Sequence, residues 1–359
     1  MGPNFYILLG PALAVAASIA LGRLVVRALR VELHREEELV LGFVVGAACL
    51  SALVAAMAAV HLDRRGAFVG LTAVVVALAL WRTRETAAKR LPRLEWRWTA
   101  LVAPVFATFG TLYLANAMGT KAADGARILF LFVFSFGRHA SAAVMHLAFL
   151  VALAMTVLCY GRRYGMPGAG AFGAIVVFTS PVAGAAATSA LDDAAVACAV
   201  FAIFYLLETR GSLALCGLLA AFALSLRHTL PPSLVFRAPR ELALWGTEAG
   251  GLLGPVFLLA PLALLALRDP HGRRLVPVAA VLMLAGAADA RWMIPALPFL
   301  ALAMGIALAR SRGALPVLAV AAALFSWPGV VGVYADPQAW RIKGLPATPV
   351  VVRDADMDK

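Results

Sequence analysis

Long apolar segments alternate with short polar joints along most of the chain. A membrane-spanning helix needs about 20 apolar residues, whereas the strands of a membrane barrel show short segments of alternating polarity. The segments here are long and unbroken, so the pattern predicts an all-α, polytopic transmembrane protein with about twelve spans, within a range of about ten to thirteen. The expected spans are residues 5–22, 39–60, 66–81, 99–117, 141–160, 168–188, 193–207, 211–226, 250–267, 275–288, 292–309 and 314–333.

Three of these segments, 66–81, 193–207 and 275–288, are short and fit tilted, broken or re-entrant helices as well as simple crossings. The pattern divides the chain into three parts. Residues 1–98 hold the first transmembrane helices and a basic joint, 99–333 form a transmembrane core, and 334–359 form a short extramembrane tail. Within the core, residues 118–140 and 227–249 are the two loops expected on the extracytoplasmic side.

Composition agrees with a membrane location. The chain is 63% hydrophobic and 14% charged, while a soluble domain carries about 25% charged residues. The net charge of +12 comes from short basic clusters between apolar segments, so no nucleic-acid partner is expected. The four cysteines lie inside apolar segments and are interpreted as small core residues. A Walker A sequence, an H-E-x-x-H motif and a nucleophile elbow are all missing from the sequence, so it does not support ATPase or protease chemistry.

The distribution of Lys and Arg predicts the orientation. Alternate joints, beginning with residues 23–38 and 82–97, hold 18 of them, and the opposite joints hold 9, so the first set is expected to be cytoplasmic. The joint 82–97 has tryptophans beside it and is typical of an interfacial anchor against anionic lipid. The run Glu36 to Glu38 is expected to be a solvated helix start without a functional role.

Candidate chemistry is expected on the opposite side of the membrane. Asp192 and Asp193 open a span after Thr179-Ser-Pro181, where helix capping and a functional site explain two adjacent acids equally well. Asp124 precedes Gly125 in a polar loop, and spacing alone favours an ordinary turn. Arginines near the span ends, Arg138, Arg227 and Arg291, would complete a site for an anionic lipid phosphate.

A short apolar stretch and two histidines follow Asp124. Residues 128–136 are too few to span the membrane and predict an interfacial helix. His139 and His146 are seven residues apart and share one helix face, so they are candidates to join Asp124 as metal ligands or as a proton relay. Two buried structural histidines are the favoured interpretation, and a divalent-metal requirement stays open.

Four stretches of the sequence resemble a known family. They are Phe136-Gly-Arg138-His139, Thr179-Ser-Pro181 with Asp192-Asp193, Gly254 to Arg268, and Ala290-Arg291-Trp-Met-Ile-Pro295-Ala-Leu-Pro298. The last is the most specific, because it resembles an Arg-aromatic-x-x-Pro-x-x-Pro motif at the start of a late span. With these stretches, the chain resembles the integral-membrane GT-C glycosyltransferases of the family 39 type, which include protein mannosyltransferases and aminoarabinose transferases.

The resemblance implies an activity and a set of site residues. It implies transfer of a sugar from a polyprenyl-phosphate donor to an acceptor hydroxyl of a glycan, lipid or protein, on the extracytoplasmic side of a bacterial inner membrane, with no bound cofactor. Asp124 would be the catalytic base, and Asp192 or Asp193 would lie near the active site. Arg227, His228 and Arg291 would bind the lipid phosphate, with Arg138 as a further cation in the first loop.

The sequence also departs from the family pattern. The loops 118–140 and 227–249 are shorter than in typical members, and no folded periplasmic domain follows Tyr334. These departures favour, as the alternative, a non-catalytic scaffold or binding subunit with a GT-C-like fold. A transporter is less favoured, because most carboxylates lie at span ends rather than in the middle of spans.

Overall fold

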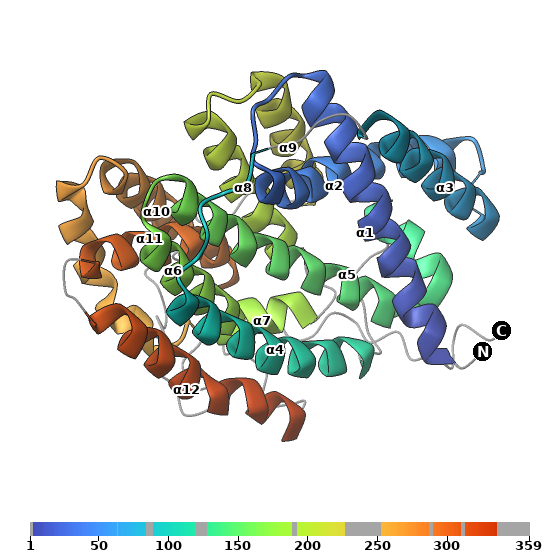
Figure 1. Cartoon of the computed structure of the whole chain (residues 1–359). Coiled ribbons are helices and arrows are strands. Elements are labelled where there is room, and N and C mark those ends of the chain that lie inside the picture. Colours follow the sequence, from blue (N-terminus) through green and yellow to red (C-terminus); the bar gives the residue numbers. More distant parts are fainter. Residues whose placement is uncertain are drawn as a thin grey trace.

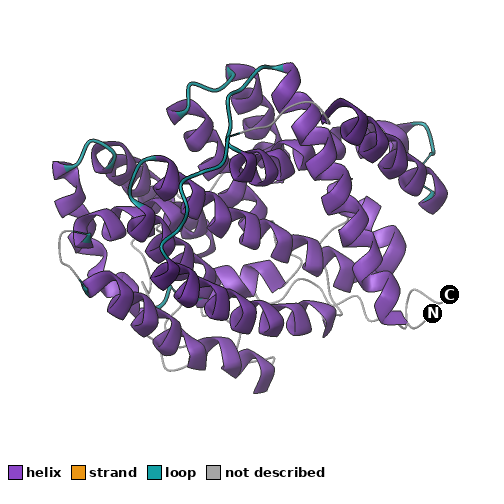
Figure 2. Cartoon of the chain, in the orientation of Figure 1, coloured by secondary structure: helices purple, strands orange, loops and turns teal. Residues whose placement is uncertain are grey.

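The computed structural model describes residues 3–62, 64–83, 89–119, 128–188, 192–226, 253–286, 290–309 and 313–335. Within these residues every regular element is a helix, which confirms the all-α prediction (Figure 1, Figure 2). The elements are α1 (Pro3–Ala28), α2 (Arg35–Ala59), α3 (Arg65–Thr83), α4 (Trp96–Gly119), α5 (Ile128–Arg163), α6 (Pro167–Thr179), α7 (Pro181–Thr188), α8 (Asp193–Glu208), α9 (Leu213–Leu226), η2 (Pro255–Arg268), α10 (Gly272–Gly286), η3 (Ala290–Ala296), α11 (Leu297–Leu308) and α12 (Ala314–Ala335).

Five of the described helices are long and apolar enough to cross a membrane. They are α1, α2, α3, α4 and the His139–Arg163 part of α5, and the bent pair α6–α7 makes a sixth if it counts as one span. Four shorter apolar helical segments, Leu213–Leu226, Val256–Arg268, Trp292–Leu308 and Ala314–Trp327, follow in the second half of the chain. The protein is therefore a helical membrane protein, and the total of twelve spans stays a prediction.

The segment 128–136 is not a separate interfacial helix, contrary to the expectation from its length. It forms the first part of α5, a single helix of 36 residues from Ile128 to Arg163. The stretch contains no proline, and Gly137, which directly follows it, costs the helix only about 1 kcal/mol. Packing against α1 adds support, because a Cβ atom added at Gly10 of α1 would lie only 2.9 Å from the Cβ of Phe136. At 1.5 Å per residue α5 is about 54 Å long, longer than the bilayer core of about 30 Å.

The predicted span 168–188 is broken into two helices. α6 ends at Thr179 and α7 begins at Pro181, and the two helices are bent by 59°. Pro181 causes the break, because a proline lacks an N–H group and disfavours helical backbone at the residue before it. Ser180 accordingly adopts extended backbone, and its hydroxyl donates to the carbonyl of Leu253 at 2.9 Å. The backbone at the break is buried but bonded, because the carbonyl of Phe178 accepts the hydroxyl of Tyr113 at 3.0 Å and that of Ser180 accepts the N–H of Gly184 at 2.9 Å.

The bundle has a buried centre and a lipid-facing periphery. The central helix α5 packs against α1, α2, α6 and α8, and α11 packs against α6 (Figure 1). The outer helices α3 and α12 expose apolar side chains, for example Val74 and Leu324, both 66% exposed. Such exposure of apolar side chains on a helix of a membrane protein is expected where the helix faces lipid.

Helices α1 and α2 cross at backbone contact. The sequences Ser18-x-x-x-Gly22 in α1 and Gly42-x-x-x-Gly46 in α2 place small residues one turn apart on both sides. A Cβ atom added at Gly46 would overlap the carbonyl oxygen of Ser18, and one added at Gly22 would overlap that of Gly42. Small residues at such spacing let two membrane helices approach closely. This close crossing brings the arginines at the end of α1 beside the start of α2.

Candidate functional site

Polar side chains gather at both ends of the described bundle. One end carries the basic joints that the Lys and Arg distribution assigns to the cytoplasm, and is called the basic end here. It contains residues 23–38, 89–97, 161–166 and 268–274, which hydrogen bonds and ion pairs connect to one another or to the adjacent end of α8. The other end, called the opposite end, contains the start of α8 and the polar end of α7. The grouping of these basic joints on one side agrees with the prediction, whereas the cytoplasmic assignment stays a prediction.

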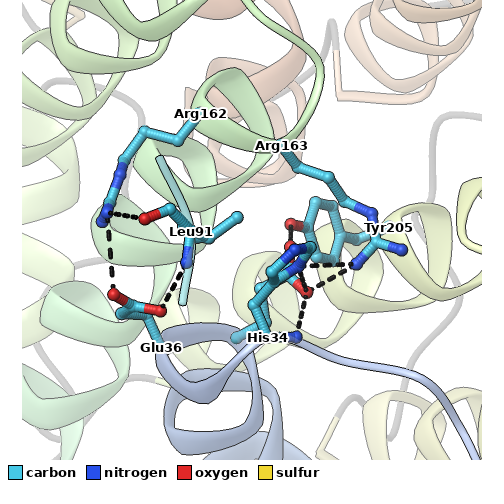
Figure 3. A network of polar contacts seen from close by, with 7 residues as sticks. His34, Glu36, Leu91, Arg162, Arg163 and Tyr205 are labelled. Atoms are coloured by element: carbon cyan, nitrogen blue, oxygen red, sulfur yellow. Dashed lines mark hydrogen bonds and ion pairs between the residues drawn. The ribbon is translucent and has the colours of Figure 1, made fainter. Parts of the chain in front are cut away.

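Glu37 is the most deeply buried charge at the basic end. Its side chain is fully buried and accepts hydrogen bonds from Nη1 of Arg163 at 2.6 Å and from the hydroxyl of Tyr205 at 2.5 Å. It also accepts the backbone N–H of His34 at 2.8 Å, as the third residue of a helix does in a capping box. Figure 3 shows His34, Arg163 and Tyr205 converging from three segments. These three and Glu37 form the Glu37 network, which joins α2 to α5 and α8.

The neighbouring acids have partners of their own. Arg27 donates two hydrogen bonds to Glu38, through Nε and, at 3.0 Å, through Nη2. Glu36 accepts the N–H of Leu91 at 3.0 Å and lies 3.6 Å from a guanidinium nitrogen of Arg162 (Figure 3). Each of the three consecutive acids is therefore matched to a different arginine.

The expectation of a solvated helix start at Glu36 to Glu38 is thus wrong in its main point. α2 does begin there, at Arg35, but Glu37 and Glu38 are 0% and 4% exposed. A buried carboxylate needs charged or hydrogen-bonding partners, and those of Glu37 come from helices far along the chain. The run of acids connects several helices rather than facing solvent.

Two further contacts extend the polar surface of the basic end. The hydroxyl of Tyr160 and Nδ1 of His271 are 3.2 Å apart, and Arg274 donates to Glu208 at 2.6 Å. Tyr164, just beyond the end of α5, packs its ring on His271, and burial raises the pKa of its hydroxyl. A tyrosine with a raised pKa stays neutral at neutral pH, so it contributes packing rather than charge.

The opposite end contains the acids expected at the active site. Asp192 directly precedes α8 and Asp193 is its first residue, and each side chain is 7% exposed. His146 of α5 is fully buried, and its Nε2 lies 3.9 Å from Oδ1 of Asp192. Nearby, the Asn116 amide of α4 donates to the hydroxyl of Thr188 at 2.7 Å. Four helices, α4, α5, α7 and α8, thus contribute polar side chains to this end.

The two acids differ in how well helix capping explains their positions. Asp193 lies in the first turn of α8, where the helix dipole favours an acid. Asp192 occupies the N-cap position, but its side chain makes no capping hydrogen bond to the described part of α8 and instead faces His146. Capping therefore accounts for Asp193 better than for Asp192.

The other predicted site residues are only partly within the structure. Asp124, Arg227 and His228 lie outside the described residues. The backbone of Arg138 lies in α5, and that of Arg291 lies in η3, which packs against α7 and α8. Of the predicted residues, the structure therefore brings Asp192 close to His146, with Asp193 next in the chain, and it packs the segment that carries Arg291 against α7 and α8.

The histidines gain no support as metal ligands. His139 is half-buried, and its ring packs edge-on against Phe134. Among the described residues, no group of three or more His, Cys, Asp and Glu side chains could hold a metal ion. Sequence reasoning missed Asn116 and Thr188. An amide near the end of an otherwise apolar span is the signal that could have indicated Asn116, because such groups bond between membrane helices.

Comparison with known proteins identifies no relative of this chain. No family model, no curated protein and no solved structure matches the chain.

Proposed function

We propose that this membrane protein transfers a sugar from a polyprenyl-phosphate donor to a hydroxyl group of a glycan, lipid or protein acceptor at the opposite end of the bundle. The observation that carries the proposal is the buried group of Asp192, Asp193 and His146. Ionisable side chains are costly inside a membrane and mark functional pathways there. The motif resemblance of the sequence supplies the reaction class.

The reaction needs a base, a site for the leaving lipid phosphate and protection from water. The acceptor hydroxyl loses its proton to a carboxylate as its oxygen bonds to the anomeric carbon, while the bond from that carbon to the phosphate oxygen breaks. We assign Asp124 as the carboxylate that accepts this proton. Arg291, with Arg138, Arg227 and His228, would stabilise the phosphate as it gains charge, since a guanidinium matches phosphate geometry and stays protonated.

The buried acids have a positioning role in this proposal. The buried His146 ring lies 3.9 Å from the carboxylate of Asp192 and limits the positions open to it, and Asp193 starts α8 directly after Asp192. In this arrangement either acid can accept a hydrogen bond from a sugar or acceptor hydroxyl. Low exposure strengthens such bonds, because electrostatic interactions are stronger in a medium of low dielectric constant.

Activity of the purified full-length protein tests the proposal. We expect transfer or donor hydrolysis in lipid vesicles with one member of a panel of polyprenyl-phosphate sugars. Asp124→Asn should abolish turnover, because it removes the base, and Asp193→Asn should reduce turnover, because it replaces a carboxylate that positions a substrate hydroxyl. Glu208→Gln is the matched control, since it removes an acid at the basic end and should leave turnover unchanged.

Each outcome has a definite meaning. Turnover retained in Asp124→Asn would remove Asp124 as the base. If folded wild-type protein showed no turnover with any donor, the transferase proposal would fail, and the non-catalytic scaffold or binding subunit would replace it.

Arg291→Ala should weaken donor binding more than it slows the chemical step at saturating donor. Loss of a charge-assisted hydrogen bond to phosphate costs about 1 to 3 kcal/mol. The donor dependence of the initial rate measures this effect, with Arg273→Ala at the basic end as the control. An unchanged apparent donor affinity in Arg291→Ala would contradict the assignment.

A further inference from the structure

A short non-helical segment crosses the basic end before α4 begins. Residues 89–95 lie between the end of α3 and the start of α4 (Figure 1, the thin teal loop that runs into α4), and with the first two residues of α4 they form the basic strap, residues 89–97. Its backbone is bonded to the bundle at several points. The carbonyl of Lys89 accepts the N–H of Arg35 at 2.9 Å, and the carbonyl of Pro92 accepts Nε of Arg162 at 2.9 Å.

These bonds fix the inner side of the strap. The N–H of Leu91 donates to Glu36 at 3.0 Å, and the Leu91 side chain is only 3% exposed. Farther along, the Trp98 ring is buried and lies close to Gly168 at the start of α6. With its backbone held in this way, the strap presents its charged side chains outward in a fixed arrangement.

The outward side chains are mainly cationic. Lys89, Arg90, Arg93 and Arg97 are all exposed, and none of them forms an ion pair with another described residue. Glu95 is the acid of the strap. Arg97 also lies in the first turn of α4, where the helix dipole disfavours a cation, so the stability of α4 does not explain it.

Other arginines of the basic end behave differently. Arg27, Arg162, Arg163 and Arg274 are each paired with a glutamate. The four glutamates involved, Glu36, Glu37, Glu38 and Glu208, thus have arginine partners already and do not compensate the cations of the strap. The uncompensated charge on the strap favours an anionic partner from outside the chain.

Two tryptophans place this charge at the membrane surface. Trp96, within the strap, is 75% exposed, and Trp81, near the end of α3, is 71% exposed. Tryptophan is enriched at the level of the lipid headgroups, where its apolar ring and its N–H group are both accommodated. Both residues belong to apolar helices with spanning length, so cations and rings lie together at the end of two membrane-spanning segments.

We infer that the basic strap binds anionic phospholipid headgroups of the leaflet at the basic end. Its cations are arranged by the fixed backbone, and its exposed tryptophan lies at headgroup depth. Arginine side chains can donate two parallel hydrogen bonds to a lipid phosphate. A surface-bound acidic protein would satisfy the charge but would not explain exposed indole rings at the end of lipid-facing helices.

Native mass spectrometry of the full-length protein, released from neutral detergent, tests this inference. Phosphatidylglycerol and phosphatidylcholine with the same acyl chains are the probes. We expect wild-type protein to retain phosphatidylglycerol in preference, and higher salt during lipid loading to reduce that preference. Combined Lys89→Gln, Arg90→Gln and Arg93→Gln should weaken phosphatidylglycerol binding by more than about tenfold, since each cation near a membrane surface contributes about fivefold.

The matched control keeps the charge. Combined Arg90→Lys and Arg93→Lys should retain most of the phosphatidylglycerol preference, and the binding of phosphatidylcholine should be the same in all variants. These side chains are exposed, so the melting temperature should not change. Equal retention of both lipids by wild-type protein, or an undiminished phosphatidylglycerol preference in the glutamine variant, would overturn the inference. The second result would direct attention to an acidic protein partner of the strap.

Discussion

Arg163→Met is expected to destabilise the folded protein by about 3 to 5 kcal/mol, the usual cost of removing one partner of a buried ion pair. The effect is large because Glu37 is fully buried and would keep only Tyr205 and His34 as partners. Glu37→Gln should cost less, since Arg163 is 21% exposed and can turn toward water. Unfolding of the protein in mild detergent, followed by circular dichroism, measures both changes.

The Arg274–Glu208 pair provides the matched control. Arg274 donates to Glu208 at the same distance of 2.6 Å, but its side chain is 60% exposed. Arg274→Met should therefore cost no more than about 1 kcal/mol, as is usual for exposed ion pairs. Arg163→Met with Glu37→Met should regain part of the stability lost in the single variant, because no uncompensated charge is left buried. Equal effects of Arg163→Met and Arg274→Met would refute the importance of the Glu37 network.

Gly46→Ala is expected to cost about 3 kcal/mol or more, since overpacking typically costs about 1 to 3 kcal/mol and here the obstacle is backbone. The new Cβ would overlap the carbonyl of Ser18, and a helix backbone cannot move aside as a flexible side chain can. Helices α1 and α2 must therefore separate, and Arg23 and Arg27 would move away from Glu38. The shift of the unfolding midpoint measures the loss.

Gly70→Ala is the matched control, because Gly70 does not touch a neighbouring helix. It lies in α3, and a Cβ atom added there meets no heavy atom of the described structure within 4 Å. Gly70→Ala should be neutral or stabilise the protein by less than about 1 kcal/mol, because alanine has the higher helix propensity. If the two alanine variants had equal stability, close packing of α1 on α2 would not be a source of stability.

Local pattern predicts the helices well and their junctions poorly. The apolar run 39–60 corresponds to α2, because a long apolar segment has no alternative to helix in a membrane. The fusion of 128–136 into α5 was not predicted, since segment length alone does not show that α1 packs beside this stretch at Gly10. The break at Pro181 has a visible sequence cause, yet a proline within a membrane helix is often tolerated, so its effect depends on tertiary context.

The chemistry was predictable in part, for a similar reason. Acids that open an apolar span are visible in sequence, and Asp192 and Asp193 do lie at a helix start with low exposure. The burial of Glu37 was not visible, because Arg163 and Tyr205 lie 126 and 168 residues farther along the chain. A run of three acids has the same local appearance whether water or distant arginines surround it.

The positions of these partners along the chain have a consequence for biosynthesis. Arg23 and Arg27 precede Glu38 by 15 and 11 residues, so its pairing can form as soon as the first two helices are inserted. Glu37 must wait for Arg163, which at about 5 to 20 residues per second is synthesised about 6 to 25 seconds later, and longer still for Tyr205. During that interval Glu37 has to stay at the water-exposed membrane surface. The pairing of α1 with α2 can thus form early in synthesis. The start of α2 reaches its final depth in the membrane only after α5 and α8 have packed against it.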